Sequence, residues 1–131
     1  MKYRVNALCC GSNQSGLSVA ISVNSCSEYA ADSSLRELCL VNCGDSTLKF
    51  CNTIKKKLNN LRLIIVSSLA PHNVSGIPGI LLSLSDLGTP KVTVVGPSGI
   101  KDFVQMFGVF VNRRLREFYY TSLCCPILLL Y

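Results

Sequence analysis

The sequence is short of the residues from which hydrolytic metal centres are built. It contains one histidine, His72, among its 131 residues. A hydrolytic zinc site takes three or more ligands from histidine, carboxylate or cysteine side chains, and a site with two metal ions takes more. One histidine cannot supply such a set, so the sequence predicts no catalytic zinc centre carried by this chain.

Charged residues and long apolar runs are also scarce. Only 15% of the residues are charged, whereas 49% are hydrophobic, so intrinsic disorder is not expected. Such a composition leaves little polar surface, and we expect part of the apolar surface to meet a partner or additional sequence. No apolar segment reaches the length of about 18 residues that a membrane-spanning helix needs, so no membrane partner is expected.

The eight cysteines include no Cys-x-x-Cys pair, so the spacing does not support a zinc ribbon. The first residues, MKYRVNALCC, lack the apolar core and small-residue cleavage site of a secretory signal, which predicts an intracellular protein with reduced thiols. Cys39, Cys43 and Cys51 lie among apolar residues. We expect these three thiols to fill space in the core.

Most of the charged residues are positively charged. Thirteen Lys and Arg residues against seven acidic ones give a formal net charge of +6, which favours polyanionic partners such as RNA or acidic lipid headgroups. The densest basic run is Lys55, Lys56 and Lys57, with Arg62 close behind it. These four residues are the candidates for RNA contact, and the alternative is that they form the solvated face of a helix.

Hydrophobic periodicity predicts alternating strands and helices. Strands are expected at residues 3–8, 17–23, 37–41, 61–66 and 92–95, and helices from Asp45 or Ser46 to about Lys57, at residues 77–87 and at residues 100–107. The first two strands should form a hairpin or lie side by side. From Leu38 onward the alternating order predicts parallel neighbours with helices packed on the sheet, so the fold class is α/β of mixed α+β type.

The pattern of alternating strands and helices is no longer clear in the sequence after Phe110. We therefore divide it into a folded domain at residues 1–110 and a divergent basic and apolar tail at residues 111–131.

Three loops follow predicted parallel strands, at residues 42–47, 67–76 and 96–99, where α/β proteins commonly place their sites. The Gly96 to Gly99 loop precedes a helix and could hold an anion there, but it lacks the lysine of a P-loop, so a plain turn is the main interpretation. A nucleophile at Ser67 or Ser68 would need His72 as its base, with no carboxylate evident to orient the imidazole. His72 is expected to be an ordinary loop residue.

Three stretches carry a resemblance to a known family. The loop and helix VSSLAPHNVSGIPGILLSLSDLG resembles the Ser-His-x-His-x-Asp-His loop and Gly-Leu-Pro-Gly helix of ribonuclease Z, the tRNA 3′-processing endoribonuclease of the metallo-β-lactamase superfamily. LVNCGDSTLKF is similar to a family turn, with Asp45 and Thr47 at matching positions. VTVVGPSGIKDFV is similar to a Gly-Pro-x-Gly-Ile segment of the family. Together the three stretches cover about Leu38 to Val104.

The departures from the family pattern fall on its metal ligands. With Gly76 to Gly79 aligned, Ser68 and Ala70 stand at the first two histidine positions, His72 at the aspartate position and Asn73 at the last histidine position. The resemblance therefore implies a degenerate loop with no catalytic and no metal-binding residue in this chain.

This pattern resembles the amino-terminal half of the long form of tRNase Z, in which two metallo-β-lactamase-like halves are joined and only the carboxyl-terminal half carries zinc. The resemblance implies a partial metallo-β-lactamase-like fold made largely of one mixed sheet. It implies a non-catalytic scaffold role in tRNA 3′-end processing, with precursor tRNA and the catalytic carboxyl-terminal half as partners. It also implies a nuclear or mitochondrial location, and no cofactor in this chain.

Two alternatives remain at this point. One is a stand-alone protein-interaction module without catalysis, which would use the apolar surface and the basic tail. The other is a small enzyme that uses Ser67 or Ser68 with His72.

Overall fold

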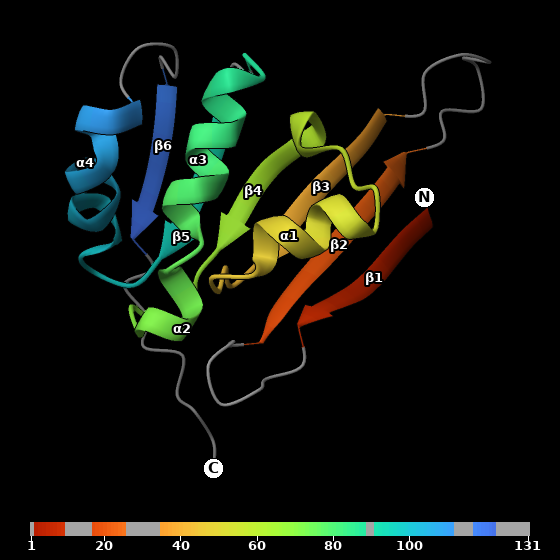
Figure 1. Cartoon of the computed structure of the whole chain (residues 1–131), viewed down its shortest axis with the longest axis horizontal. Helices are drawn as coiled ribbons and strands as arrows, with labels where there is room; N and C mark the ends of the chain where they lie inside the picture. The colour runs from red at the N-terminus through yellow and green to blue at the C-terminus, as the bar shows by residue number, and fades with distance from the viewer. Residues whose placement is uncertain (1, 10–16, 26–34, 89–90, 112–116, 123–131) are drawn as a thin grey trace.

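The computed structural model describes residues 2–9, 17–25, 35–88, 91–111 and 117–122 (Figure 1). Six strands form one sheet in chain order: β1 (Lys2–Cys9), β2 (Ser18–Ser25), β3 (Leu35–Val41), β4 (Leu61–Ile65), β5 (Lys91–Gly96) and β6 (Glu117–Ser122). Between them lie α1 (Thr47–Thr53), the 3-10 turn η1 (Leu58–Asn60), α2 (Pro71–Val74), α3 (Ile77–Asp86) and α4 (Ile100–Val111). Within these ranges, no helix has the length and apolar character needed to cross a bilayer.

The sheet changes direction once, at β3. β1, β2 and β3 pair antiparallel, whereas β3, β4, β5 and β6 pair parallel. Parallel neighbours need a crossover connection, and right-handed crossovers between strands in consecutive order place the intervening helices on the same face of the sheet. The predicted hairpin, the parallel neighbours and the mixed α/β class are confirmed.

The core lies between one face of the sheet and the helices. Leu40, Ile64 and Val94 come from three adjacent strands and are completely buried. They belong to one cluster with Ile80 of α3 and Ile100 of α4. In Figure 1, α1 and α3 cross in front of the sheet on this covered side.

The second face of the sheet carries apolar residues of its own. They alternate with the core residues along each strand, and register aligns Val19 with Val41, Val41 with Ile65 and Ile65 with Val95. A second row aligns Ile21 with Cys39 and Cys39 with Leu63. These side chains are half-buried, and no described helix packs on them. We call the surface formed by these seven residues the open sheet face: Val19, Ile21, Cys39, Val41, Leu63, Ile65 and Val95.

The helix expected to run to about Lys57 is shorter than predicted. α1 ends at Thr53, and Lys55 has a φ of 53° in the left-handed region. The backbone N–H of Lys56 donates to the Cys51 carbonyl at 2.9 Å and that of Lys55 to the Asn52 carbonyl at 3.1 Å, which is the hydrogen-bond pattern of a Schellman motif. Lys55 to Lys57 therefore lie in a turn and not on a helix face.

The carboxyl-terminal part also holds structure that the sequence pattern did not predict. α4 extends to Val111, and β6 pairs parallel with β5 along its length. The β6 sequence EFYYTS is rich in aromatic and β-branched residues, which favour strands, but it follows no turn signal. The division of the chain at residue 110 stays a prediction.

Candidate functional site

Two of the three candidate loops are bound to each other at one edge of the sheet. The Cys43 N–H donates to the Asn73 carbonyl and the Gly76 N–H donates to the Cys43 carbonyl, each at 2.8 Å. A Cβ atom at Gly76 would collide with the carbonyl oxygen of Gly44. The loops after β3 and β4 thus approach so closely that only glycine fits between them.

Asn42 and Ser67 join the same two loops through side chains. The Asn42 side-chain carbonyl accepts the Ser67 N–H at 2.9 Å and the Ser67 hydroxyl at 3.0 Å. Asn42 has a φ of 54°, a conformation that asparagine tolerates better than most residues. Its side chain is thereby turned back over the start of the second loop.

Asn73 occupies the centre of this network. Its side chain is only 7% exposed, and its amide nitrogen donates to the Ser68 hydroxyl at 2.8 Å and to the Ser67 hydroxyl at 3.2 Å. A buried amide without partners would cost about 1–3 kcal/mol. The two serines therefore satisfy a group that the loop has to bury.

His72 lies apart from these groups. It is on α2, a short helix within the segment predicted as a loop, and its side chain is exposed. In the described part of the chain no hydrogen bond links His72 to Ser67 or Ser68, whose hydroxyls are engaged with Asn73. The geometry thus does not assemble the serine and histidine pair that a nucleophilic mechanism requires.

The donor set at this edge does not fit zinc. Zinc in proteins is held by thiolate, imidazole and carboxylate ligands, whereas Asn42, Asn73, Ser67 and Ser68 offer amides and hydroxyls that are already bonded to one another. Across the described ranges, no group of three or more His, Cys, Asp or Glu residues is placed to hold a metal ion. No catalytic step can be derived through a metal here.

The buried cysteines do not change this conclusion. Burial, with smaller effects from Cys51 and Cys39, raises the pKa of the Cys43 thiol to about 12. Burial also raises the pKa of Cys51 to about 11, against a lowering effect of the Lys56 ammonium. Both residues are completely buried and belong to the hydrophobic core cluster, so both fill the core.

The third loop forms a strand-to-helix turn. Gly99 has a φ of 95°, and a Cβ atom there would lie 3.1 Å from the Leu69 side chain. The Ile100 N–H donates to the Pro97 carbonyl at 3.2 Å, and Asp102 places a carboxylate in the first turn of α4. A carboxylate at a helix amino terminus occupies the position that favours a bound anion, so the turn offers no support for anion binding.

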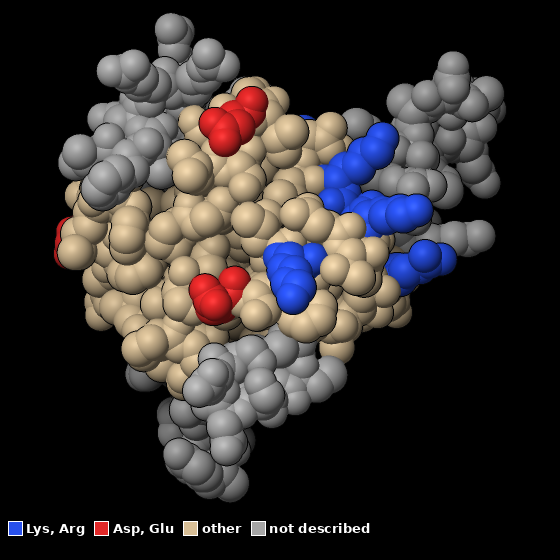
Figure 2. Space-filling view, in the orientation of Figure 1, with Lys and Arg blue, Asp and Glu red and all other residues tan. Residues whose placement is uncertain are grey.

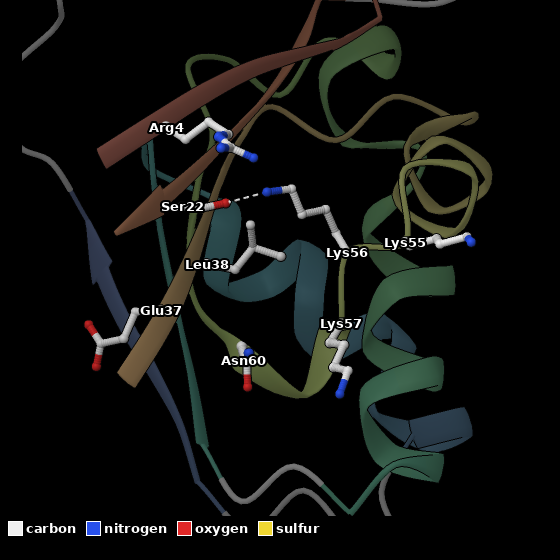
Figure 3. Close-up of a pocket in the computed structure, with 8 residues that line it drawn as sticks. All are labelled: Arg4, Ser22, Glu37, Leu38, Lys55, Lys56, Lys57 and Asn60. Atoms are coloured by element: carbon white, nitrogen blue, oxygen red, sulfur yellow. Dashed lines mark hydrogen bonds between the residues drawn. The ribbon is translucent and has the colours of Figure 1, made fainter. Parts of the chain in front are cut away.

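The basic run takes part in a pocket of about 300 Å³ between the first three strands and the turn after α1 (Figure 3). Its lining consists of Arg4, Ser22, Glu37, Leu38, Lys55, Lys56, Lys57 and Asn60. Arg62, predicted to act with the lysines, is exposed on β4 and does not line the pocket.

Of the eight lining residues, sequence analysis predicted only the three lysines, and the missed residues include Arg4 and Ser22. They form a cross-strand pair between β1 and β2. A predicted hairpin register could have found them, because it fixes which residues share a face.

The sequence of the chain is similar to curated ribonuclease Z proteins, although no family model matches it. It is 35% identical over 74 residues to ribonuclease Z of Methanosarcina mazei, covering 56% of this chain and 24% of the relative. It is 33% identical over 76 residues to the mitochondrial tRNase Z TRZ4 of Arabidopsis thaliana, covering 56% of this chain and 8% of the relative. The resemblance to ribonuclease Z is confirmed, and the chain spans a quarter or less of these relatives.

The fold is similar to larger solved structures. The long-form RNase Z from yeast matches 92% of this chain with a TM-score of 0.78 and 20% identity, and the match covers 18% of that chain. The metallo-β-lactamase fold protein YhfI from Bacillus subtilis matches 92% of this chain with a TM-score of 0.63 and 13% identity, and the match covers 46% of YhfI. The predicted partial metallo-β-lactamase fold is confirmed.

Proposed function

We propose that this chain is a non-catalytic portion of a tRNA 3′-processing ribonuclease Z, corresponding to the amino-terminal half of the long form. The observation that supports the proposal is the network of Asn73 with Ser67 and Ser68. In the family motif, histidines stand where this loop has Ser68 and Asn73. The loop serves as a structural support between two strands, and the described ranges contain no group of ligands for the metal ions that would activate water.

The names of the relatives support the proposed substrate. Their names, ribonuclease Z and tRNase Z, denote RNA-processing enzymes, and precursor tRNA is the partner we propose for the assembly to which this chain contributes. The basic residues Lys55, Lys56, Lys57 and Arg62 are the proposed contacts to RNA. The name of the Arabidopsis relative includes mitochondrial, and we propose the mitochondrion as one location of this protein.

The open sheet face supports a scaffold role. Its residues are apolar and half-buried on the side that no described helix covers. The match to YhfI covers only 46% of that metallo-β-lactamase fold chain, so more than half of such a chain has no counterpart here. The proposed occupant of the open sheet face is a second sheet of the ribonuclease Z assembly, which would bury both apolar surfaces.

Reconstitution of cleavage tests the proposal. The chain would be incubated with a 3′-extended precursor tRNA and zinc, alone and together with the catalytic carboxyl-terminal half of a long-form tRNase Z. We expect no 3′ cleavage by the chain alone, and faster cleavage with both proteins than with the catalytic half alone. Metal-dependent cleavage by the chain alone would overturn the proposal. Absence of any effect on the catalytic half would favour a stand-alone interaction module instead.

A further inference from the structure

The pocket between the first three strands and the turn after α1 brings together positively charged side chains from segments that are distant in the sequence. Arg4 comes from β1, whereas Lys55, Lys56 and Lys57 come from the turn after α1, and Glu37 is the single carboxylate in the lining. Four cationic side chains against one carboxylate leave three net positive charges around the pocket. In Figure 2, blue Lys and Arg side chains gather on the side of the molecule where α1 and the first strands lie.

Two of these cations lie beside Ser22, and one of them bonds to its hydroxyl group. The Lys56 ammonium donates to the Ser22 hydroxyl at 2.7 Å, and Arg4 is the cross-strand neighbour of Ser22 in the register of β1 and β2. Figure 3 shows Arg4 and Lys56 approaching Ser22 from two sides, whereas the side chains of Lys55 and Lys57 extend away from it. In the described part of the chain no carboxylate forms an ion pair with Arg4 or Lys56.

The backbone holds Lys56 in this position at an energetic cost. Lys55 occupies the left-handed position of the Schellman motif, where glycine is the usual residue, and a side chain in that conformation is strained. This turn positions Lys56 so that its side chain extends across the pocket toward β2. Lys56 is half-buried, which strengthens its interaction with a bound anion relative to a fully solvated lysine.

We propose that this pocket binds a phosphate group between Arg4, Lys56 and Ser22. A guanidinium binds two phosphate oxygens through parallel N–H bonds, an ammonium supplies a point charge, and a serine hydroxyl can donate to a third oxygen. A volume of about 300 Å³ is sufficient for a phosphate with its attached sugar. If the proposed function holds, on which this step rests, the bound phosphate group is a backbone phosphate of tRNA.

The first test uses inorganic phosphate as the probe and does not depend on RNA processing. Backbone amide NMR signals of Ser22 and Lys56 in the full chain should shift as phosphate is added, and the double variant Arg4→Gln/Lys56→Gln should lose this response. The matched control is Lys49→Gln/Lys101→Gln, which removes the same charge from exposed positions on α1 and α4. Thermal unfolding of each variant verifies that it is folded, and Ser22→Ala should weaken binding without any change of charge.

The second arm identifies the source of the phosphate. A short single-stranded oligoribonucleotide should shift the same amides and displace phosphate, and the pocket variant should reduce the salt dependence of RNA binding by a slope of about 1–2. Displacement indicates an RNA backbone phosphate, and phosphate binding without displacement indicates a free phosphate compound. The inference is overturned if neither probe shifts these amides, or if the control variant loses the response equally. Neither result bears on whether the chain cleaves RNA.

Discussion

At the scale of single residues, Gly76 is the position at which the two site loops depend most on one residue. A Cβ atom there meets the carbonyl oxygen of Gly44, so Gly76→Ala should lower the free energy of unfolding by about 2–3 kcal/mol through overpacking. The matched control is Gly79→Ala in the first part of α3, where the nearest atom is 3.9 Å away. This control should leave stability unchanged or raise it by about 0.5–1 kcal/mol. Urea unfolding measures both variants, and equal stabilities would refute the close approach.

The Cys43 thiol should make the free energy of unfolding depend on pH in the alkaline range. Burial raises the pKa of Cys43 from 9.0 to about 12. Because the folded-state pKa lies above the unfolded value, the neutral thiol contributes its full stabilisation below pH 9 and loses it as the pH rises toward 12.

We expect the free energy of unfolding of the native chain to fall more steeply over this pH range than that of Cys43→Ala. Chemical unfolding at several pH values measures the difference. Cys39→Ala, at a half-buried position, serves as the control and should change the slope less. Parallel curves for the native chain and Cys43→Ala would contradict the assigned pKa.

Residue-level prediction from residue type succeeded in part. Cys39, Cys43 and Cys51 were all expected in the core, and the structure buries Cys43 and Cys51 but leaves Cys39 half-buried on the open sheet face. The bonds from Asn73 to Ser67 and Ser68 did not follow from sequence. They require α2 to fold the loop back on itself, and a helix of four residues leaves almost no periodic signal.

At the scale of elements, the end of α1 is determined by a residue that is poorly suited to its position. Lys55 has a φ of 53°, so Lys55→Gly should raise the free energy of unfolding by about 0.5–1 kcal/mol. The relief of backbone strain exceeds the entropy that glycine adds to the unfolded chain. Asn52→Gly, within α1, is the control and should lower stability by about 0.3–0.5 kcal/mol, because asparagine is itself a poor helix former. Thermal or urea unfolding compares the two, and destabilisation by both would argue against the left-handed turn.

Sequence patterns located the elements better than their ends. Strands at residues 61–66 and 92–95 were evident from continuous apolar runs, which suit parallel strands covered on both sides. The end of α1 was misplaced by four residues because lysine is a good helix former and gives no stop signal. β6 was missed because it follows the basic segment after α4 without a recognisable turn, and only its pairing with β5 defines it.

At the scale of the whole molecule, the open sheet face is the surface through which we propose that the chain associates. Ile21 lies in the second row of that face, opposite Cys39. Ile21→Lys should prevent co-elution with the catalytic half of a long-form tRNase Z in size-exclusion chromatography, because the charge would have to be buried against an apolar sheet. The control is Leu82→Lys on α3, where the side chain is 48% exposed, and it should co-elute as the native chain does. Circular dichroism verifies that both variants are folded, and co-elution of Ile21→Lys would contradict the proposed docking.

The composition anticipated this surface without locating it. A chain with 49% hydrophobic residues has more apolar side chains than its covered face takes up, but composition does not say where they lie. Strand order and register place them together on one face. Those pairings join residues far apart in the chain, and no local pattern in a single sequence specifies them.

The most direct test of the central claim is the zinc content of the purified 131-residue chain after equilibration with zinc, measured by plasma mass spectrometry. The degenerate loop predicts no stoichiometric zinc at this edge of the sheet, so the native chain and His72→Ala/Asn73→Ala should retain the same amount. Stoichiometric zinc that is retained by the native chain and lost from this double variant would show a working metal site and contradict the account.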